Sequence, residues 1–165
     1  HHSILTFFQT SHSNPFYSTL SLLVIMILKI VKWLLAIALA AAFVAAGANK
    51  LTGQIHPETH AFLAKGFTKY ITIFPWNQTG WSAETFRVVV GLAEVTFGLL
   101  ALCPHYTRLS AFVFIGLMAG ASYTHFAFHD PFVVPAVLGG LSFLLFLVSG
   151  DAVPNKSVGA AKKKQ

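Results

Sequence analysis

Glu94 is an acidic side chain in the middle of an apolar stretch of the sequence. It lies about ten residues inside that stretch, which places it about 15 Å from the end of a helix at 1.5 Å per residue. A carboxylate at such a depth in a membrane normally faces other protein groups and has a partner. We therefore expect an intramembrane polar site at Glu94, with candidate partners Lys50, Arg87, Tyr123 and His125. A functional site and a structural polar contact between helices are equally consistent with the sequence.

Two histidine pairs have metal-ligand spacing. His56 and His60 lie four residues apart, and so do His125 and His129. That spacing can hold a zinc ion on one face of a helix. The glutamate that completes the metalloprotease helix motif is missing from both pairs. Hydrogen bonding by these histidines is therefore the first expectation, with a zinc pocket as the alternative and no metal ligand assigned.

The composition indicates an integral membrane protein. Of the 165 residues, 55% are hydrophobic and only 10% are charged, and the mean hydropathy is +0.68. Soluble domains carry about 25% charged residues. The net charge of +6 does not indicate nucleic-acid binding, because the Lys and Arg residues are scattered and gathered at the C-terminus instead of forming one stripe. No nucleophile triad, phosphate loop or haem motif is present, so nothing in the sequence supports an enzyme.

Four apolar segments predict an all-α membrane protein. Each segment is long enough to cross a bilayer, and short connections after the second and third make neighbouring helices antiparallel. We expect a four-helix transmembrane bundle over residues 26–150. The excess of Lys and Arg on the side of the termini predicts that both termini are cytoplasmic. The predicted spans are residues 30–48, 85–102, 106–128 and 132–149.

The first 25 residues differ from the rest because they contain no Asp, Glu, Lys or Arg. A single span from Phe16 to Ala48 would be too long and would bury Lys29 and Lys32. We therefore predict that Met26 is the initiator and that residues 1–25 are a non-native or disordered leader. A cleaved signal peptide is the alternative.

The loop between the first two spans is long and contains a predicted helix. Pro57 suits the first turn of a helix, and apolar residues from Phe62 to Ile71 recur at helical spacing opposite polar ones. This pattern predicts a helix lying in the membrane interface. Asn77 begins a glycosylation sequon in the same loop.

Small residues are frequent in the predicted spans. Gly116 and Gly120 lie in the third, and Gly139 and Gly140 in the fourth. Because small residues let helix backbones approach closely in a membrane, we expect tight helix packing at these positions.

Residues 151–165 form a predicted basic cytoplasmic tail. Lys162 and Lys163 lie fourth and third from the end, as in the dilysine signal that returns membrane proteins to the endoplasmic reticulum. A basic tail that contacts anionic lipids is the alternative.

Three motifs together carry a resemblance to a known family. They are the sequence GANKLT at 47–52, the sequence GLAEVTFG at 91–98, and His125 placed five residues before the loop residues Asp130 and Pro131. Their order and spacing resemble the DoxX-like membrane proteins over residues 26–149. Within that family they are most similar to the branch that contains the novel acetylcholine receptor chaperone, NACHO.

The resemblance implies a four-helix transmembrane fold and two functions. The NACHO-like branch assists assembly of channel subunits in the endoplasmic reticulum, which implies a non-enzymatic chaperone whose partners are the bilayer, client membrane proteins and further copies of the chain. Bacterial members are linked to membrane oxidoreductase complexes of the inner membrane. In that alternative, the chain is an accessory subunit and Glu94, His125 and His129 line a quinone pocket. No cofactor is expected in the first case.

Overall fold

The computed structural model describes residues 15–73 and 75–150, and this part of the chain is helical without strands. The all-α prediction is confirmed. The α-helices are α2 (Pro15–Leu51), α3 (Pro57–Tyr70), α4 (Ala83–Ala101), α5 (Thr107–Ala127) and α6 (Val133–Val148). A short 3₁₀ helix, η2 (Trp76–Gln78), lies between α3 and α4.

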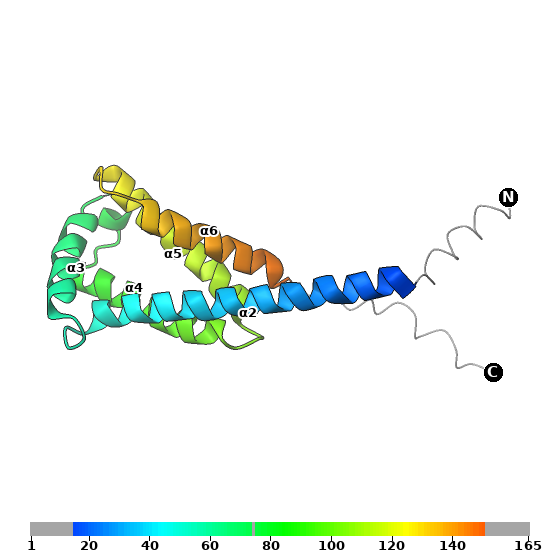
Figure 1. Cartoon of the computed structure of the whole chain (residues 1–165). Coiled ribbons are helices and arrows are strands. Elements are labelled where there is room, and N and C mark those ends of the chain that lie inside the picture. Colours follow the sequence, from blue (N-terminus) through cyan, green and yellow to red (C-terminus); the bar gives the residue numbers. More distant parts are fainter. Residues whose placement is uncertain (1–14, 74, 151–165) are drawn as a thin grey trace, which may run out of the picture.

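Four of these helices pack side by side. α2 packs against α4 and α6, and α5 packs against the same two helices, so the contacts form a closed ring. Figure 1 shows α2 lying along α4, while α5 and α6 pair with each other. Inside the ring, the rings of Phe43 and Phe114 stack with their centroids 3.8 Å apart. The core therefore depends on aromatic stacking between α2 and α5.

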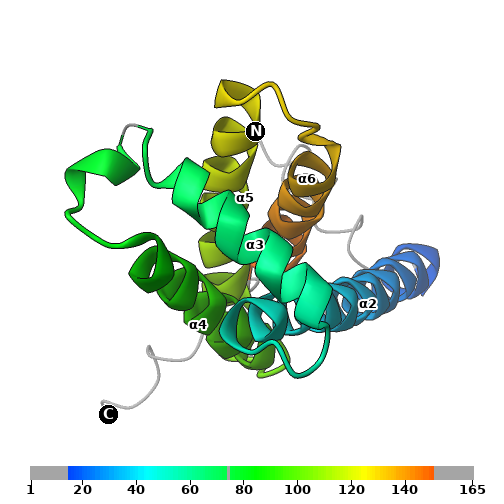
Figure 2. The ribbon, with the colours of Figure 1, turned by 90° about the vertical axis from the view of Figure 1, so that its left-hand side faces the viewer.

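α3 lies across one end of the other helices, as Figure 2 shows. It packs against α4 and α2. Phe67 is its buried residue and contacts the ring of Phe86 on α4. α3 begins at Pro57, as the sequence predicts, because proline suits the first turn where its missing N–H costs nothing.

Two helices, α2 and α5, are long and apolar enough to cross a membrane by length and composition. α6 is apolar but shorter, with 16 residues. α4 has 19 residues and carries Glu84, Arg87 and Glu94. The helices lie close to the four predicted spans, and membrane crossing by all four stays a prediction.

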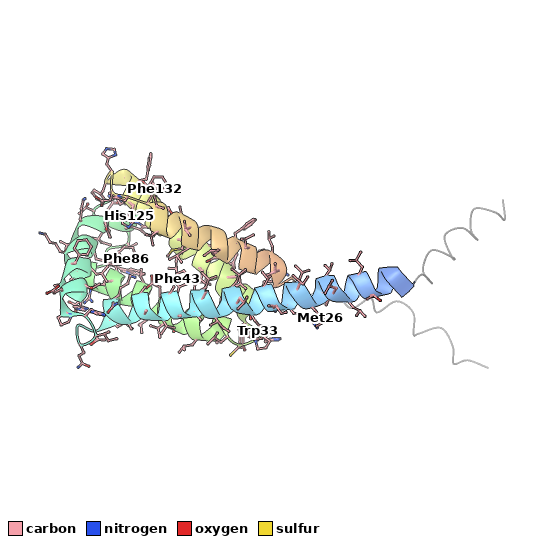
Figure 3. The ribbon with its side chains drawn as sticks, in the orientation of Figure 1. Met26, Trp33, Phe43, Phe86, His125 and Phe132 are labelled. Carbon is pink, nitrogen blue, oxygen red and sulfur yellow. The ribbon has the colours of Figure 1, made fainter. Side chains whose placement is uncertain are left out.

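α2 is longer than the predicted first span. It begins at Pro15 and runs through residues 15–25, a segment for which the sequence predicts a leader and not a helix. No Gly or Pro interrupts the chain between Phe16 and Ala46, so nothing in that stretch breaks the helix. Residues 19–31 are exposed and project beyond the other helices, as Figure 3 shows around Met26. A start of translation at Met26 stays a prediction.

The end of α5 forms a sharp turn. The N–H of Asp130 donates to the carbonyl oxygen of His125 (2.9 Å), and that of His129 donates to Phe126 (3.1 Å). This pair of bonds is the Schellman motif, whose left-handed position is held here by His129 with φ of 56°. Pro131 follows and cannot continue the helix. The turn predicted at Asp130 and Pro131 therefore has a structural basis.

Candidate polar site and cavity

Glycines bring α2 and α4 unusually close together. A Cβ atom added at Gly47 would lie 2.7 Å from the carbonyl oxygen of Gly91 and 2.8 Å from Cγ2 of Val95. A Cβ atom at Gly98 would lie 2.7 Å from Cγ2 of Val44. Real Cβ atoms are not found at such short distances. The two helices can approach this closely only because glycine occupies position 47 on α2 and position 98 on α4.

This close approach positions a buried ion pair. Nζ of Lys50 lies 2.9 and 2.7 Å from the two carboxylate oxygens of Glu94. The two side chains are only 12% and 4% exposed. Removing one partner of a buried pair leaves an uncompensated charge, so each residue needs the other. Of the candidate partners of Glu94, the structure places Lys50 in direct contact.

Arg87 and His60 join three helices at the end of α2. Arg87 donates a hydrogen bond to the carbonyl oxygen of Lys50, and its Nη1 lies 3.3 Å from each ring nitrogen of His60. Nδ1 of His60 lies 2.9 Å from the carbonyl oxygen of Asn49, to which it donates in the matching tautomer. The last carbonyls of a helix have no intrahelical partner. Residues from α3 and α4 therefore cap α2.

Tyr123 lies away from this polar site. Its side chain is 45% exposed on α5, and the structure does not bring it to Glu94. His125 instead contacts α3, where its ring lies 5.8 Å from that of Tyr70. Nδ1 of His125 is buried and has no hydrogen-bond partner among the described residues.

A cavity of about 410 Å³ lies between the helices. Most of its lining side chains are apolar or aromatic, and Lys50 and Glu94 form part of its wall. Figure 3 shows Phe43, Phe86 and His125, three lining residues from different helices. The further lining residues are Ala42, Ala46, Phe62, Leu63, Phe67, Tyr70, Trp76, Val90, Gly116, Leu117, Met118, Gly120, Ala121, Thr124, Val134, Pro135 and Leu138.

The four histidines do not gather into a metal site. His56 is exposed at the start of α3, and His129 is exposed in the turn after α5. His60 binds the end of α2, while His125 lines the cavity. Within residues 15–73 and 75–150, no three His, Cys, Asp or Glu residues lie close enough to hold a metal ion.

The C-terminal end of α3 is attached to the turn after α5. Nζ of Lys69 lies 3.6 Å from a carboxylate oxygen of Asp130 and 4.1 Å from the ring centroid of Phe128. Burial, together with the nearby Asp130 carboxylate, raises the pKa of Tyr70 above its usual value of 10.0. The phenol therefore stays protonated further into the alkaline range than a free tyrosine does.

Two modification predictions fall outside this site. Asn77 is exposed in η2, where its side chain accepts a hydrogen bond from Gln78. Lys162 and Lys163 lie outside the described residues. Glycosylation and retrieval therefore stay predictions.

Two contributions to the site were not predicted from the sequence. Nε1 of Trp76 donates to Oγ1 of Thr124 (3.3 Å), which ties the loop to α5 across the cavity wall. The second contribution is the close contact of Gly91 and Gly98 with α2. Their spacing of seven residues puts them on one face of α4. That spacing is a signal from which the close contact with α2 can be predicted.

Comparison with protein-family models matches residues 31–130 to the family described as DoxX. The match contains the whole polar site, from Lys50 to His125, and the turn after α5. Comparison with curated proteins gives no match.

Proposed function

The chain belongs to the DoxX family of membrane proteins, and from this premise we propose that it is a four-span assembly factor that binds client membrane proteins through helix contacts and catalyses no reaction. α2, α4, α5 and α6 would be the spans, and α3 would lie in the interface at the bundle end. The apolar outward faces of these helices support the proposal, since such faces suit lipid and other membrane helices.

One observation carries the client-binding role, and it is an open glycine on α6. A Cβ atom added at Gly140 would meet nothing within 4 Å. Gly140 lies among exposed residues at helical spacing, which we call the α6 outer face: Val133, Ala136, Val137, Gly140, Leu144 and Leu147. A glycine there lets a second helix approach closely. The α6 outer face therefore offers a groove for a client helix.

Substitution of Gly140 tests this role. We expect Gly140→Leu to lower the recovery of immature channel or receptor subunits, co-isolated in mild detergent, by about tenfold, which corresponds to about 1.4 kcal/mol of contact. Gly116→Leu is the matched control, because Gly116 also faces open space but lies on α5. Equal recovery with both variants would overturn the proposal.

The proposal includes a topology and a location. Both termini would be cytoplasmic, in the endoplasmic reticulum membrane of a eukaryote or the inner membrane of a bacterium. Gel mobility before and after deglycosylation tests the topology in eukaryotic cells. Modification at Asn77 supports it, whereas modification at Asn155, which begins a second sequon in the C-terminal tail, would invert it.

The cavity favours a second candidate function, that of an accessory subunit of a membrane oxidoreductase. His125 lines the cavity beside apolar walls, as a quinone site would need. In this case redox subunits, and no immature channel subunits, would be recovered with the protein.

A further inference from the structure

The cavity has the size of a small-molecule site. Its volume of about 410 Å³ lies within the range of ligand pockets. Along α5 its lining residues extend from Gly116 to His125, which is about 14 Å at 1.5 Å per residue. The space is therefore long enough for a body of several fused rings.

The rim of the cavity is apolar. Phe62 of α3 and Val134 of α6 are exposed lining residues, at 74% and 69%. Because each of them both lines the cavity and is exposed, α3 and the first turn of α6 contribute to its rim. A molecule that passes this rim loses its water to apolar side chains, which favours a lipophilic ligand.

The charged groups of the wall are paired, and so are Trp76 and Thr124. Lys50 and Glu94 neutralise each other at 2.7 Å, so a charged ligand would meet no free countercharge. Trp76 donates to Thr124, whose hydroxyl donates in turn to the carbonyl oxygen of Gly120 (2.8 Å). Nδ1 of His125 is the buried side-chain atom of the described wall that has no partner. A buried polar atom without a partner costs free energy, and a ligand oxygen would remove that cost. Because Nδ1 has almost no accessible surface, the imidazole must turn toward the cavity for this contact to form.

We propose that this cavity binds an uncharged, sterol-sized lipophilic molecule whose single hydroxyl or carbonyl oxygen hydrogen-bonds to Nδ1 of His125. Nδ1 accepts from a hydroxyl in one tautomer and donates to a carbonyl in the other. The inference goes beyond the assembly role and does not depend on it, because the cavity lies inside the helix ring and Gly140 does not line it.

Three steroids with the same four-ring system test the proposal on the full chain purified in detergent. Cholesterol offers a hydroxyl, progesterone offers carbonyls, and cholesterol sulfate offers a charge on the same ring system. We expect saturable binding of cholesterol or progesterone, seen as a raised melting temperature and a bound mass in native mass spectrometry. Binding of progesterone requires a protonated Nδ1, whereas the hydroxyl of cholesterol can bind either tautomer because it both donates and accepts. Binding of neither, or equally tight binding of cholesterol sulfate, would overturn the proposal.

Two substitutions locate the binding. Gly116→Leu places a side chain at the cavity wall and should abolish sterol binding, whereas Gly140→Leu should leave it unchanged. His125→Phe keeps a ring against Tyr70 but removes Nδ1, so the affinity should fall about tenfold. Wild-type affinity in His125→Phe would contradict the assignment, even if Gly116→Leu proves unstable. Loss of sterol binding with normal client recovery would separate this inference from the proposed function.

Discussion

Glycines on two sides of the molecule have opposite surroundings. Between α2 and α4, Cβ atoms at Gly47 and Gly98 would lie 2.7 Å from their neighbours. On α5 and α6, Cβ atoms at Gly116 and Gly140 would meet nothing within 4 Å. The first pair serves packing within the chain, while the second leaves space beside the helix. The same residue type therefore marks a close helix contact on one side and unfilled space on the other. We call the contact between α2 and α4 the closed side, and the region around Gly116 and Gly140 the open side.

The charged groups of the two sides also differ, although Oδ1 of Asn49 on α2 is, like Nδ1 of His125, buried without a partner among the described residues. On the closed side, Lys50 and Glu94 pair at 2.7 Å and the end of α2 is capped by Arg87. On the open side, Nδ1 of His125 is buried without a partner in the described chain. Satisfied polar contacts hold a fold together, whereas an unsatisfied one is available to a ligand. We therefore expect substitutions on the closed side to change stability and those on the open side to change binding.

The largest effect is expected from Glu94→Gln, which removes one charge of the buried pair. Lys50 would be left uncompensated, so the free energy of unfolding in detergent should fall by about 3 kcal/mol. The double variant Lys50→Met/Glu94→Met removes both charges and should recover most of that loss. If Glu94→Gln keeps its stability but loses client recovery, Glu94 belongs to a binding site and not to the closed contact.

A smaller loss of stability is expected from Gly47→Ala. The added methyl group would meet the backbone of Gly91, which has no flexible end that can move aside. The helices must separate, at a cost of about 2 kcal/mol, measured as a lowered melting temperature. A melting temperature equal to that of the wild type would show that the closed contact is not tight.

On the open side, replacing glycine by alanine is expected to raise the free energy of unfolding instead of lowering it. Gly140→Ala and Gly116→Ala add a methyl group into open space and replace glycine inside a helix. Each should raise the free energy of unfolding by about 0.5 kcal/mol, because alanine loses less conformational entropy than glycine. Destabilisation similar to that of Gly47→Ala would remove the distinction between the two sides.

The smallest effect is expected at alkaline pH, through Tyr70 on the wall of the cavity. Its raised pKa means that the folded chain keeps the phenol proton where the unfolded chain loses it. This stabilisation is complete below pH 10.0, the usual value, and is lost as the pH rises through the raised pKa. Tyr70→Phe should therefore show a smaller fall in melting temperature over that range. Asp130→Asn lowers the pKa of Tyr70 in the folded chain, so its fall should begin at the same pH, end at a lower pH and be smaller in total than in the wild type. An unchanged profile would exclude the Asp130 charge as a cause.

The helices could be predicted from the sequence because their signals are local. Pro57 marks the start of α3, and long apolar runs mark the helices that form the ring. The resemblance to the DoxX family is also confirmed by the match over residues 31–130. The beginning of α2 was not predicted, since the absence of charge in residues 15–25 suggested a separate segment.

The site was only partly predictable because it depends on which helix face turns inward. Lys50 was one of four candidate partners of Glu94, and the sequence could not select it over Tyr123. On α5 the lining residues recur with helical spacing through Gly120, Thr124 and neighbouring positions, and Tyr123 falls outside that face. The cavity is a space left between side chains of five helices, and no local pattern encodes such a space.

Site-specific photo-crosslinking shows whether the α6 outer face binds a client. A photoreactive residue replaces Val137, which flanks Gly140 on the α6 outer face, or Leu92, an exposed residue on α4. If this face binds a client, we expect adducts with immature membrane-protein subunits from position 137 and none from position 92. Adducts of equal yield from both positions, or from position 92 alone, would contradict it.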